Sequence, residues 1–341
     1  MRAAVYYNNK DVRVEEVPRP EIKKGELLVK VEASGICGSD VMEWYRVKKA
    51  PLVLGHEIAG TVEEIGEGVE GLEKGDRVTV SHHVPCNVCR YCLSGNYTVC
   101  DTLRATNFDP GGFSEYVRVP AVNVERGGVF RLPNWVSFED ATFAEPLGCV
   151  VRGFRIAGMS PGKSVLVIGS GISGLLHVKL AKIFGASFIA AVDINEDRLG
   201  FAKRFGADVT VLAKENPKKA IVERFGRLCD IVSLTAAGDS AITQGIGCVE
   251  RGGTILFFAP REPEKTYPMP LFGIWKDQIT FKNTYASAPL DTLTALELIA
   301  GGKVIVKDMI TNRLPLSEIQ RGFDMASAAG ESVKVMIAPQ K

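Results

Sequence analysis

The sequence predicts an α/β protein in which a β-rich domain precedes a doubly wound parallel sheet. One observation is the stretch 164–193, where an apolar strand, a glycine-rich turn, a helical pattern and a second apolar strand follow one another. Another is that strand and helix patterns go on alternating as far as residue 284, which is typical of a parallel sheet. A third is that residues 1–80 hold short β patterns separated by glycine and proline, which favour a compact, mostly antiparallel domain.

The turn within 164–193 has the pattern of a dinucleotide-binding site. It reads Gly169-Ser-Gly171-Ile-Ser173-Gly174 and directly follows the strand 165–168. The first glycine permits a sharp turn, the second lets the backbone approach a pyrophosphate, and the third lets the helix pack closely on the strand. The free N–H groups at the start of the helix are suited to binding phosphates. A glycine pattern alone is weak evidence, but here the strand and the helix are both in place.

An acidic residue follows the second strand at the spacing expected for a ribose contact. Asp193 lies 19 residues after Gly174, close to the ~20 residues usual for the carboxylate that accepts hydrogen bonds from the ribose. A carboxylate there repels a 2′-phosphate, and neither Ile194 nor Asn195 supplies a cation beside it. We therefore expect NAD rather than NADP, with Arg198 placed to reach the adenine side.

The composition is that of an ordinary globular protein of about two domains. The chain has 341 residues, of which 46% are hydrophobic and 24% charged. A net charge of +1 argues against a nucleic acid or a membrane surface as the main partner. Residues 1–10 lack the apolar core of a secretory signal, and the apolar stretches are too interrupted to span a membrane. We therefore expect a cytoplasmic protein.

Four of the eight cysteines lie close together at the spacing C-x2-C-x2-C-x7-C, namely Cys86, Cys89, Cys92 and Cys100. Four thiolates in one loop close a tetrahedron around an ion and leave no open position, which is typical of structural zinc. Disulfides at this spacing would need strained short loops, and an iron–sulfur cluster is the main alternative. We expect a structural zinc that pins a long loop with little core of its own.

Two glycine turns in the β-rich half carry a second set of metal-binding residue types. Cys37 and Ser39 lie in the first turn, and His56 and Glu57 in the second. A catalytic zinc has three protein ligands and an open position, and Cys, His and Glu all serve as ligands. Taken alone, the two turns favour the simpler interpretation of a buried cysteine and a hydrogen-bonded histidine.

The chain has only four histidines, and the three other than His56 have simple structural interpretations. His177 lies on the helix after the glycine turn, and His82 and His83 are expected to be exposed beside the cysteine group. His56 is therefore the plausible reactive one. Glu145 is a further candidate, because a carboxylate in so apolar a stretch either lies on the surface or faces a cation.

In this order the motifs resemble those of the zinc-dependent medium-chain dehydrogenases, and most of all the sorbitol (polyol) and threonine dehydrogenase branch. The resemblance covers essentially the whole chain. It implies a GroES-like catalytic domain at 1–150 with a structural zinc lobe at 86–100, and a Rossmann NAD-binding domain at 151–290. It also implies that 291–341 completes the Rossmann domain and returns to the catalytic domain through a strand at 333–337. The active site is then expected in the cleft between the domains, in a homodimer or homotetramer.

The resemblance also assigns roles to individual residues. It makes Cys37 and His56 ligands of a catalytic zinc, with Glu57 in the third position typical of the polyol branch. Glu145 takes the place of the second cysteine of typical alcohol dehydrogenases, binding zinc directly or through water. Ser39 matches the hydroxyl that contacts the zinc-bound alcohol. The remaining matches are the structural zinc ligands Cys86, Cys89, Cys92 and Cys100, and the NAD-binding residues Gly169, Gly171, Ser173, Gly174, Asp193 and Arg198.

Two positions depart from the pattern of the family. Alcohol, polyol and threonine dehydrogenases commonly carry a proton-relay histidine five residues after the first zinc cysteine, where this chain has Met42. Glu43 or ordered water would have to serve instead. The polyol branch also has an Arg-Tyr pair that holds substrate hydroxyls, where this chain has Thr284 before Tyr285. Both changes argue against sorbitol itself as the substrate.

We therefore expect zinc- and NAD-dependent oxidation of a secondary alcohol, polyol or sugar-derived, to a ketone, or the reverse reaction. The partner is then a small-molecule alcohol or ketone. A threonine-type amino-alcohol dehydrogenase and an enzyme acting on a sugar-acid ketone remain alternatives. A non-catalytic zinc-stabilised NAD-binding protein is a third, favoured only by Met42. The set Cys37, His56, Glu57 and Glu145 argues against it, and against a zinc-free quinone reductase, because neither needs an open metal site.

Overall fold

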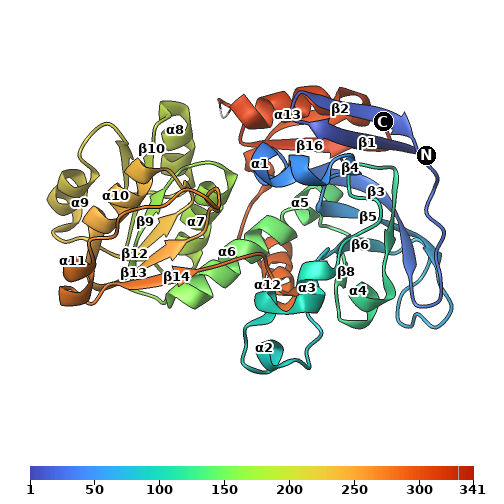
Figure 1. The fold of residues 1–341 in the computed structure, drawn as a ribbon, viewed down its shortest axis with the longest axis horizontal. Helices are drawn as coiled ribbons and strands as arrows, with labels where there is room; N and C mark the ends of the chain where they lie inside the picture. The colour runs from blue at the N-terminus through green and yellow to red at the C-terminus, as the bar shows by residue number, and fades with distance from the viewer. Residues whose placement is uncertain (329) are drawn as a thin grey trace. The chain divides into compact units, whose positions relative to one another are not determined.

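The computed structural model describes residues 1–328 and 330–341, which form two compact units. Unit 1 comprises Met1–Gly148 and Ala286–Lys341, and unit 2 comprises Cys149–Tyr285 (Figure 1). Helix α6 (Ala144–Ala157) begins in unit 1 and continues into unit 2. Among the described residues no helix is long and apolar enough to cross a membrane.

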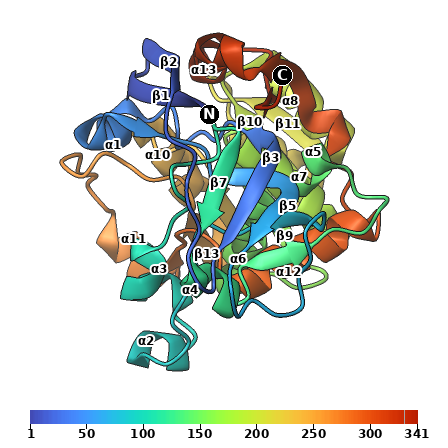
Figure 2. The ribbon, with the colours of Figure 1, turned by 90° about the vertical axis from the view of Figure 1, so that its right-hand side faces the viewer.

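Unit 1 is built on two sheets. The smaller has the order β2-β1-β4, and the larger runs β15-β16-β3-β5-β6-β8. Strand β7 pairs with β3, and Figure 2 shows the two side by side. The strands are β1 (Arg2–Asn8), β2 (Asp11–Glu16), β3 (Leu27–Gly35), β4 (Leu52–Val53), β5 (Glu57–Ile65), β6 (Arg77–Val80), β7 (Tyr116–Val119), β8 (Val129–Arg131), β15 (Ile310–Pro315) and β16 (Lys334–Ala338). The helices are α1 (Glu43–Arg46), α2 (Arg90–Leu93), α3 (Asp101–Ala105), α4 (Ala121–Glu125), α5 (Phe138–Ala141), α12 (Pro289–Ala300) and α13 (Ile319–Ala328).

Unit 1 has two main apolar clusters. Apolar side chains of β3, β5, β6 and β7 form one cluster, and side chains of β1, β16 and α13 form another. Most of β3 is buried, and only Lys30 and Glu32 within it are partly exposed. The strands β3 and β5 pair antiparallel with Gly35 opposite Glu57. This register sets the turn after β3 beside the start of β5.

Unit 2 is a parallel six-stranded sheet in the order β11-β10-β9-β12-β13-β14. Figure 1 shows α7 on one side of this sheet and α9 and α10 on the other. The strands are β9 (Ser164–Ile168), β10 (Phe188–Asp193), β11 (Val209–Leu212), β12 (Cys229–Leu234), β13 (Val249–Phe257) and β14 (Thr280–Asn283). The helices are α7 (Ile172–Ile183), α8 (Glu196–Phe205), α9 (Pro217–Phe225), α10 (Asp239–Cys248) and α11 (Leu271–Lys276).

The strand order of unit 2 reverses at β9, which lies between β10 and β12. In an open parallel sheet, ligands bind at the carboxyl ends of the strands where the order reverses. The glycine turn follows β9 directly, so it occupies this position. The predicted fold class, a β-rich domain with a doubly wound parallel sheet, is confirmed.

Candidate active site and metal centres

The register of β3 and β5 brings three predicted metal ligands together. Cys37 follows the end of β3, and His56 and Glu57 lie at the start of β5. The cysteine sulfur, an imidazole nitrogen and a carboxylate oxygen all lie within 4.8 Å of one another. Zinc bonds of about 2.0–2.3 Å bring the ligands of one ion to within about 4 Å of each other. The three side chains are therefore close enough to share one ion.

A buried carboxylate orients the histidine of this group. Asp40 is inaccessible to solvent, and its Oδ1 lies 3.4 Å from His56 Nδ1. Its Oδ2 accepts a hydrogen bond from the Cys37 backbone N–H at 3.0 Å. Burial alone would raise the pKa of Asp40, but the nearby His56 and Arg46 outweigh it and lower that pKa. When an ionised carboxylate interacts with one ring nitrogen of a histidine, the other ring nitrogen is free to bind a metal.

Glu57 has a buried cation as its partner. Both side chains of the pair Glu57–Lys334 are inaccessible to solvent, and Lys334 Nζ also donates to the Ile36 carbonyl at 3.0 Å. A Cβ added at Gly35 would lie 2.7 Å from Lys334 Cε, so only glycine leaves room for this approach. The second oxygen of Glu57, Oε1, is buried without a hydrogen-bond partner among the described residues. A bound cation would satisfy that oxygen, so the donor set fits zinc.

Ser39 lies next to the cysteine of the group. Its backbone N–H and its hydroxyl each donate to Cys37 Sγ at 3.4 Å. Arg46 holds the serine from the other side, since Nε donates to the Ser39 carbonyl and Nη2 to Ser39 Oγ, both at 2.9 Å. The serine hydroxyl therefore stands between a metal-ligand sulfur and a cationic side chain. Glu43, suggested above as a substitute for the relay histidine, accepts a hydrogen bond from the Asn9 backbone N–H at 3.1 Å.

Glu145 is not part of this group of ligand atoms. It lies in the first turn of α6, is buried with 8% of its surface exposed, and contributes no atom to the cluster that includes Cys37. Its role as a zinc ligand, direct or through water, stays a prediction.

The cysteine lobe has the dimensions of a tetrahedral metal site. Its four Sγ atoms lie within 4.8 Å of one another, and Cys89 Sγ and Cys92 Sγ are 3.6 Å apart. Zinc–sulfur bonds of 2.3 Å imply about 3.8 Å between neighbouring sulfurs. Burial raises the pKa of Cys100, but the backbone N–H groups of Cys86 and Leu103 lower it, to about 6 overall. The lobe also has little apolar core, and Figures 1 and 2 show its helix α2 standing away from the sheets of unit 1.

We expect Cys92→Ser to remove one zinc per chain and to unfold the lobe locally, because few apolar contacts hold it without the metal. Zinc measured by mass spectrometry and amide hydrogen exchange over 86–100 would report this. The matched control is Cys248→Ser, which changes a buried thiol of unit 2. Equal zinc contents in the two variants would contradict a metal site in the lobe.

The glycine turn of unit 2 has the conformation that its sequence predicts. Gly169 has a φ of +98°, which favours glycine, and a Cβ on Gly174 would overlap the Gly169 carbonyl oxygen. A Cβ on Gly171 would meet only Arg198 Nη1, at 3.7 Å. The second glycine thus borders open space with a guanidinium nearby, which is the environment that a pyrophosphate requires. Ser173 follows Gly171 by two residues and lies in the first turn of α7.

Asp193 closes the turn from the end of β10. Its Oδ2 accepts from the Ser170 backbone N–H at 2.5 Å, and its Oδ1 accepts from the Asn195 backbone N–H at 2.8 Å. These bonds fix the carboxylate at the carboxyl edge of the sheet. The Nε of Arg198 is buried and makes no hydrogen bond within the described part of the chain. Asp193 is therefore held at the edge predicted to bind the nucleotide, and Arg198 has a buried nitrogen that a ligand could satisfy.

One histidine lies closer to the metal ligands than the sequence indicated. The ring of His82 has its centroid 4.9 Å from that of His56 and 3.8 Å from that of His83. Burial, reinforced by these two rings, lowers the pKa of His82 well below its usual value. The expectation that His82 and His83 are exposed is wrong, because the loop after β6 folds back toward the start of β5.

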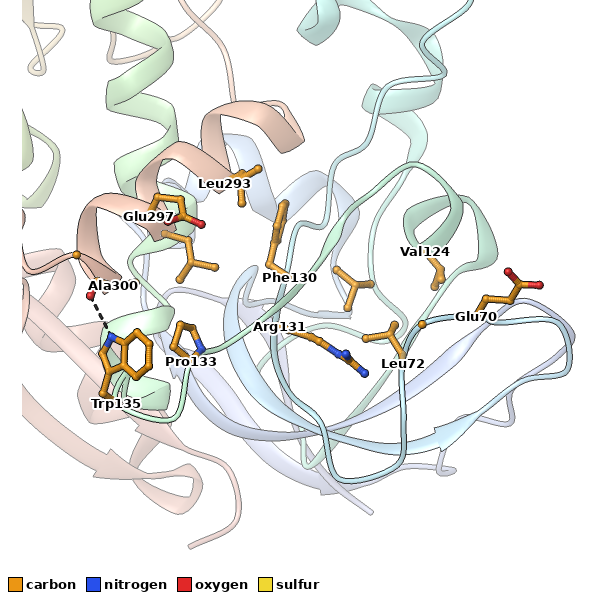
Figure 3. Close-up of a pocket in the computed structure, with 14 residues that line it drawn as sticks. Glu70, Leu72, Val124, Phe130, Arg131, Pro133, Trp135, Leu293, Glu297 and Ala300 are labelled. Atoms are coloured by element: carbon orange, nitrogen blue, oxygen red, sulfur yellow. Dashed lines mark hydrogen bonds between the residues drawn. The ribbon is translucent and has the colours of Figure 1, made fainter.

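A separate pocket of about 650 Å³ opens on unit 1 (Figure 3). Phe130, Trp135 and Leu293 line it, and Trp135 Nε1 donates to the Ala300 carbonyl at 3.0 Å. None of the predicted metal ligands or nucleotide-binding residues borders this pocket. It is therefore not part of the candidate active site.

Comparison with known proteins agrees with this geometry. Residues 23–129 match the family model of the alcohol dehydrogenase GroES-like domain, and residues 173–301 match that of the zinc-binding dehydrogenases. The chain belongs to the zinc-dependent medium-chain dehydrogenase family. The predicted family is thereby confirmed, and with it the use of zinc and a nicotinamide dinucleotide as cofactors of that family.

Three relatives illustrate the branch. D-xylulose reductase A of Aspergillus niger is 32% identical over 342 residues, covering 96% of this chain and 93% of that protein. A zinc-binding dehydrogenase of Sinorhizobium meliloti 1021, solved with NADP, has a TM-score of 0.89 and 30% identity over 99% of both chains. Galactitol-1-phosphate dehydrogenase of Escherichia coli has a TM-score of 0.86 and 28% identity, covering 99% of this chain and 100% of that one. These similarities support the polyol branch of the family.

Four residues of the site were missed by sequence reasoning, namely Asp40, Arg46, His82 and Lys334. Asp40 had a usable signal, since it lies in the same turn as Cys37 and is a carboxylate among apolar neighbours. Lys334 had none, because a single lysine in an apolar strand usually indicates an exposed edge. Only the pairing of β16 with β3 shows that this lysine faces Glu57.

Proposed function

We propose that this protein oxidises a secondary hydroxyl of a polyol to the ketone with NAD, and catalyses the reverse reduction. The observation that carries the proposal is the buried group of Cys37, His56 and Glu57, with an unsatisfied carboxylate oxygen and the Ser39 hydroxyl beside it. A protein that only binds NAD has no need of such a group. The relatives named D-xylulose reductase and galactitol-1-phosphate dehydrogenase support a polyol or its ketone as substrate.

Within this proposal the chain's own residues have separate tasks. Zinc, held by Cys37, His56 and Glu57, would supply a Lewis acid that lowers the pKa of the substrate hydroxyl, and NAD would supply the hydride acceptor. Ser39 Oγ accepts a hydrogen bond from the substrate hydroxyl and takes up its proton while releasing its own. Arg46 Nη2 donates to that oxygen at 2.9 Å and so holds the hydroxyl in place. Met42 has no group that exchanges protons, so Ser39 gives its own hydroxyl proton to water as it takes up that of the substrate.

The experiment that tests the function is NADH formation by the zinc-loaded protein on polyols, sugar acids and amino alcohols, beside a chelator-treated sample. We expect turnover on polyols such as xylitol, lost after chelation. If only threonine were oxidised, the substrate class would be the amino alcohols and not the polyols. Absence of turnover on every substrate, with zinc and NAD bound, would favour the non-catalytic alternative.

We also propose NAD rather than NADP as the cofactor, on account of the charge of Asp193. We expect Asp193→Asn to weaken NADH binding about fivefold, because a hydrogen bond to a charged acceptor is worth roughly 1 kcal/mol more than one to a neutral acceptor. NADPH binding should become tighter, since the repulsion of the 2′-phosphate is lost. Titration of both nucleotides by fluorescence measures this. Asp197→Asn, at an exposed position on α8, is the control, and equal effects of the two variants would refute the assignment.

We propose that copies of this chain associate through the β14 edge of unit 2. This strand ends the six-stranded sheet, and the adjoining helix α11 exposes 71% of Leu271, 74% of Phe272 and 75% of Trp275. An open strand edge beside exposed large apolar side chains is typical of an interface. We expect Trp275→Glu to lower the mass measured by light scattering, whereas Trp135→Glu, at an equally exposed tryptophan of unit 1, should not. An unchanged mass in both would contradict this interface.

A cytoplasmic location is part of the same proposal. All eight cysteines are free thiols, including the three that lie outside the two metal-binding groups. Reduced thiols without disulfides are usual in a reducing compartment.

A further inference from the structure

His82 stands beside the metal ligands without being one of them. It follows β6 in the loop that leads to the cysteine lobe, and its ring centroid lies 4.9 Å from that of His56. Phe108 borders the ring on another side, with centroids 6.1 Å apart. Yet neither nitrogen of His82 belongs to the group of ligand atoms formed by Cys37, His56 and Glu57. The imidazole therefore adjoins the place where a substrate would meet the metal.

The ring of His82 has unused hydrogen-bonding capacity. Its Nδ1 is buried and has no hydrogen-bond partner among the residues that the structure describes. The neighbouring His83 differs, because its Nδ1 lies 3.0 Å from the Thr106 carbonyl oxygen. A buried polar atom without a partner costs about 1–3 kcal/mol. Such a cost next to an active site is explained when a bound ligand supplies the missing partner.

A polyol supplies such a partner, whereas a simple alcohol does not. A polyol carries a hydroxyl on the carbon next to the reacting one, and this second hydroxyl lies within a few ångströms of the first. A hydrogen-bonding side chain close to the metal but outside its ligand set is placed for that hydroxyl. The position that would hold substrate hydroxyls by family resemblance has Thr284 in place of arginine, so the hydrogen bonds of an arginine side chain are lost there.

We propose that His82 is a specificity-determining residue that hydrogen-bonds the hydroxyl adjacent to the reacting carbon. This inference rests on the proposed function and names the residue that makes a polyol the preferred substrate. It assigns His82 to substrate recognition, and leaves the metal to Cys37, His56 and Glu57.

The test compares 2,3-butanediol with 2-butanol, which differ by the one neighbouring hydroxyl. We expect the wild type to prefer the diol, and His82→Phe to lower kcat/KM for the diol about 10- to 100-fold, as the loss of one buried hydrogen bond predicts. The value for 2-butanol should change less than about threefold. His82→Gln keeps a polar side chain and should restore part of the preference. If His82→Phe does not fold, the same measurements are made on His82→Leu, which has a smaller apolar side chain.

Two further readouts separate recognition from a structural or metal role. Zinc content should stay at the wild-type level in His82→Phe, and xylitol should bind the protein–NADH complex at least about tenfold more weakly, measured by NADH fluorescence. The matched control is His177→Phe, which changes a fully buried histidine of unit 2 and should leave the diol preference intact.

Each outcome decides the inference. A diol preference that survives in His82→Phe, or a loss of zinc from that variant, would overturn it. If the wild type oxidises no alcohol, the proposed function fails, but binding of xylitol to wild type and variant still decides the role of His82. Weaker xylitol binding to the variant would then support His82 as a polyol contact in a non-catalytic protein.

Discussion

Cys37→Ala is expected to lower kcat/KM on the polyol substrate by at least about 10³-fold while NADH binding stays within twofold. The loss follows because a metal ion supplies several kcal/mol of transition-state stabilisation, and each 1.4 kcal/mol is a factor of ten in rate. The substitution removes one of three clustered ligand atoms and the sulfur to which Ser39 donates two hydrogen bonds. NADH binding should persist because the glycine turn belongs to unit 2 and Cys37 to unit 1.

Steady-state kinetics, zinc analysis and NADH titration of the same preparation check this expectation. Cys248→Ala is the matched control, since it removes a buried thiol of unit 2 that contacts no predicted ligand. It should retain both zinc and turnover. If Cys37→Ala kept turnover within tenfold of the wild type, catalysis would not depend on this ion, and the proposed chemistry would be wrong.

The nucleotide-binding unit was predictable because its signals are local. The apolar run 165–168 became β9, and the run ending at Asp193 became β10 with that residue as its last. A sharp turn off a buried strand requires a positive φ, and Gly169 supplies it at +98°. Strand, turn and helix are neighbours in the chain, so periodicity and glycine placement were sufficient. The grouping of the four lobe cysteines was predictable for the same reason, since these predicted ligands lie within one loop.

The environment of the first metal site was only half predictable. Cys37, His56 and Glu57 were candidates by residue type, and the family resemblance singled them out as ligands. Their partners depend on the pairing of distant strands, which the sequence does not display. Glu57 and Lys334 are 277 residues apart in the chain. His82 was misjudged for a related reason, since its sequence neighbours are the cysteine lobe while its ring contacts His56.

Lys334→Met is expected to lower the free energy of unfolding of the metal-free protein by about 3–5 kcal/mol. The substitution leaves the fully buried Glu57 carboxylate without its cation, and an uncompensated charge in the interior is costly. Urea unfolding of metal-free protein measures the effect. Lys30→Met is the matched control, because Lys30 forms a partly exposed pair with Glu32 at 3.0 Å on β3. A pair of that kind contributes only about 0.2–1 kcal/mol.

The cause of this loss can be isolated in two ways. Adding Glu57→Gln to Lys334→Met removes the unpaired charge, so the double variant should recover most of the lost stability. Zinc should also reduce the cost of Lys334→Met, since the ion would balance the carboxylate that the lysine no longer neutralises. A cost no larger than that of Lys30→Met would show that Glu57 does not need its buried partner. A cost that zinc fails to reduce would argue that Glu57 is held by Lys334 alone and is not a ligand of the metal.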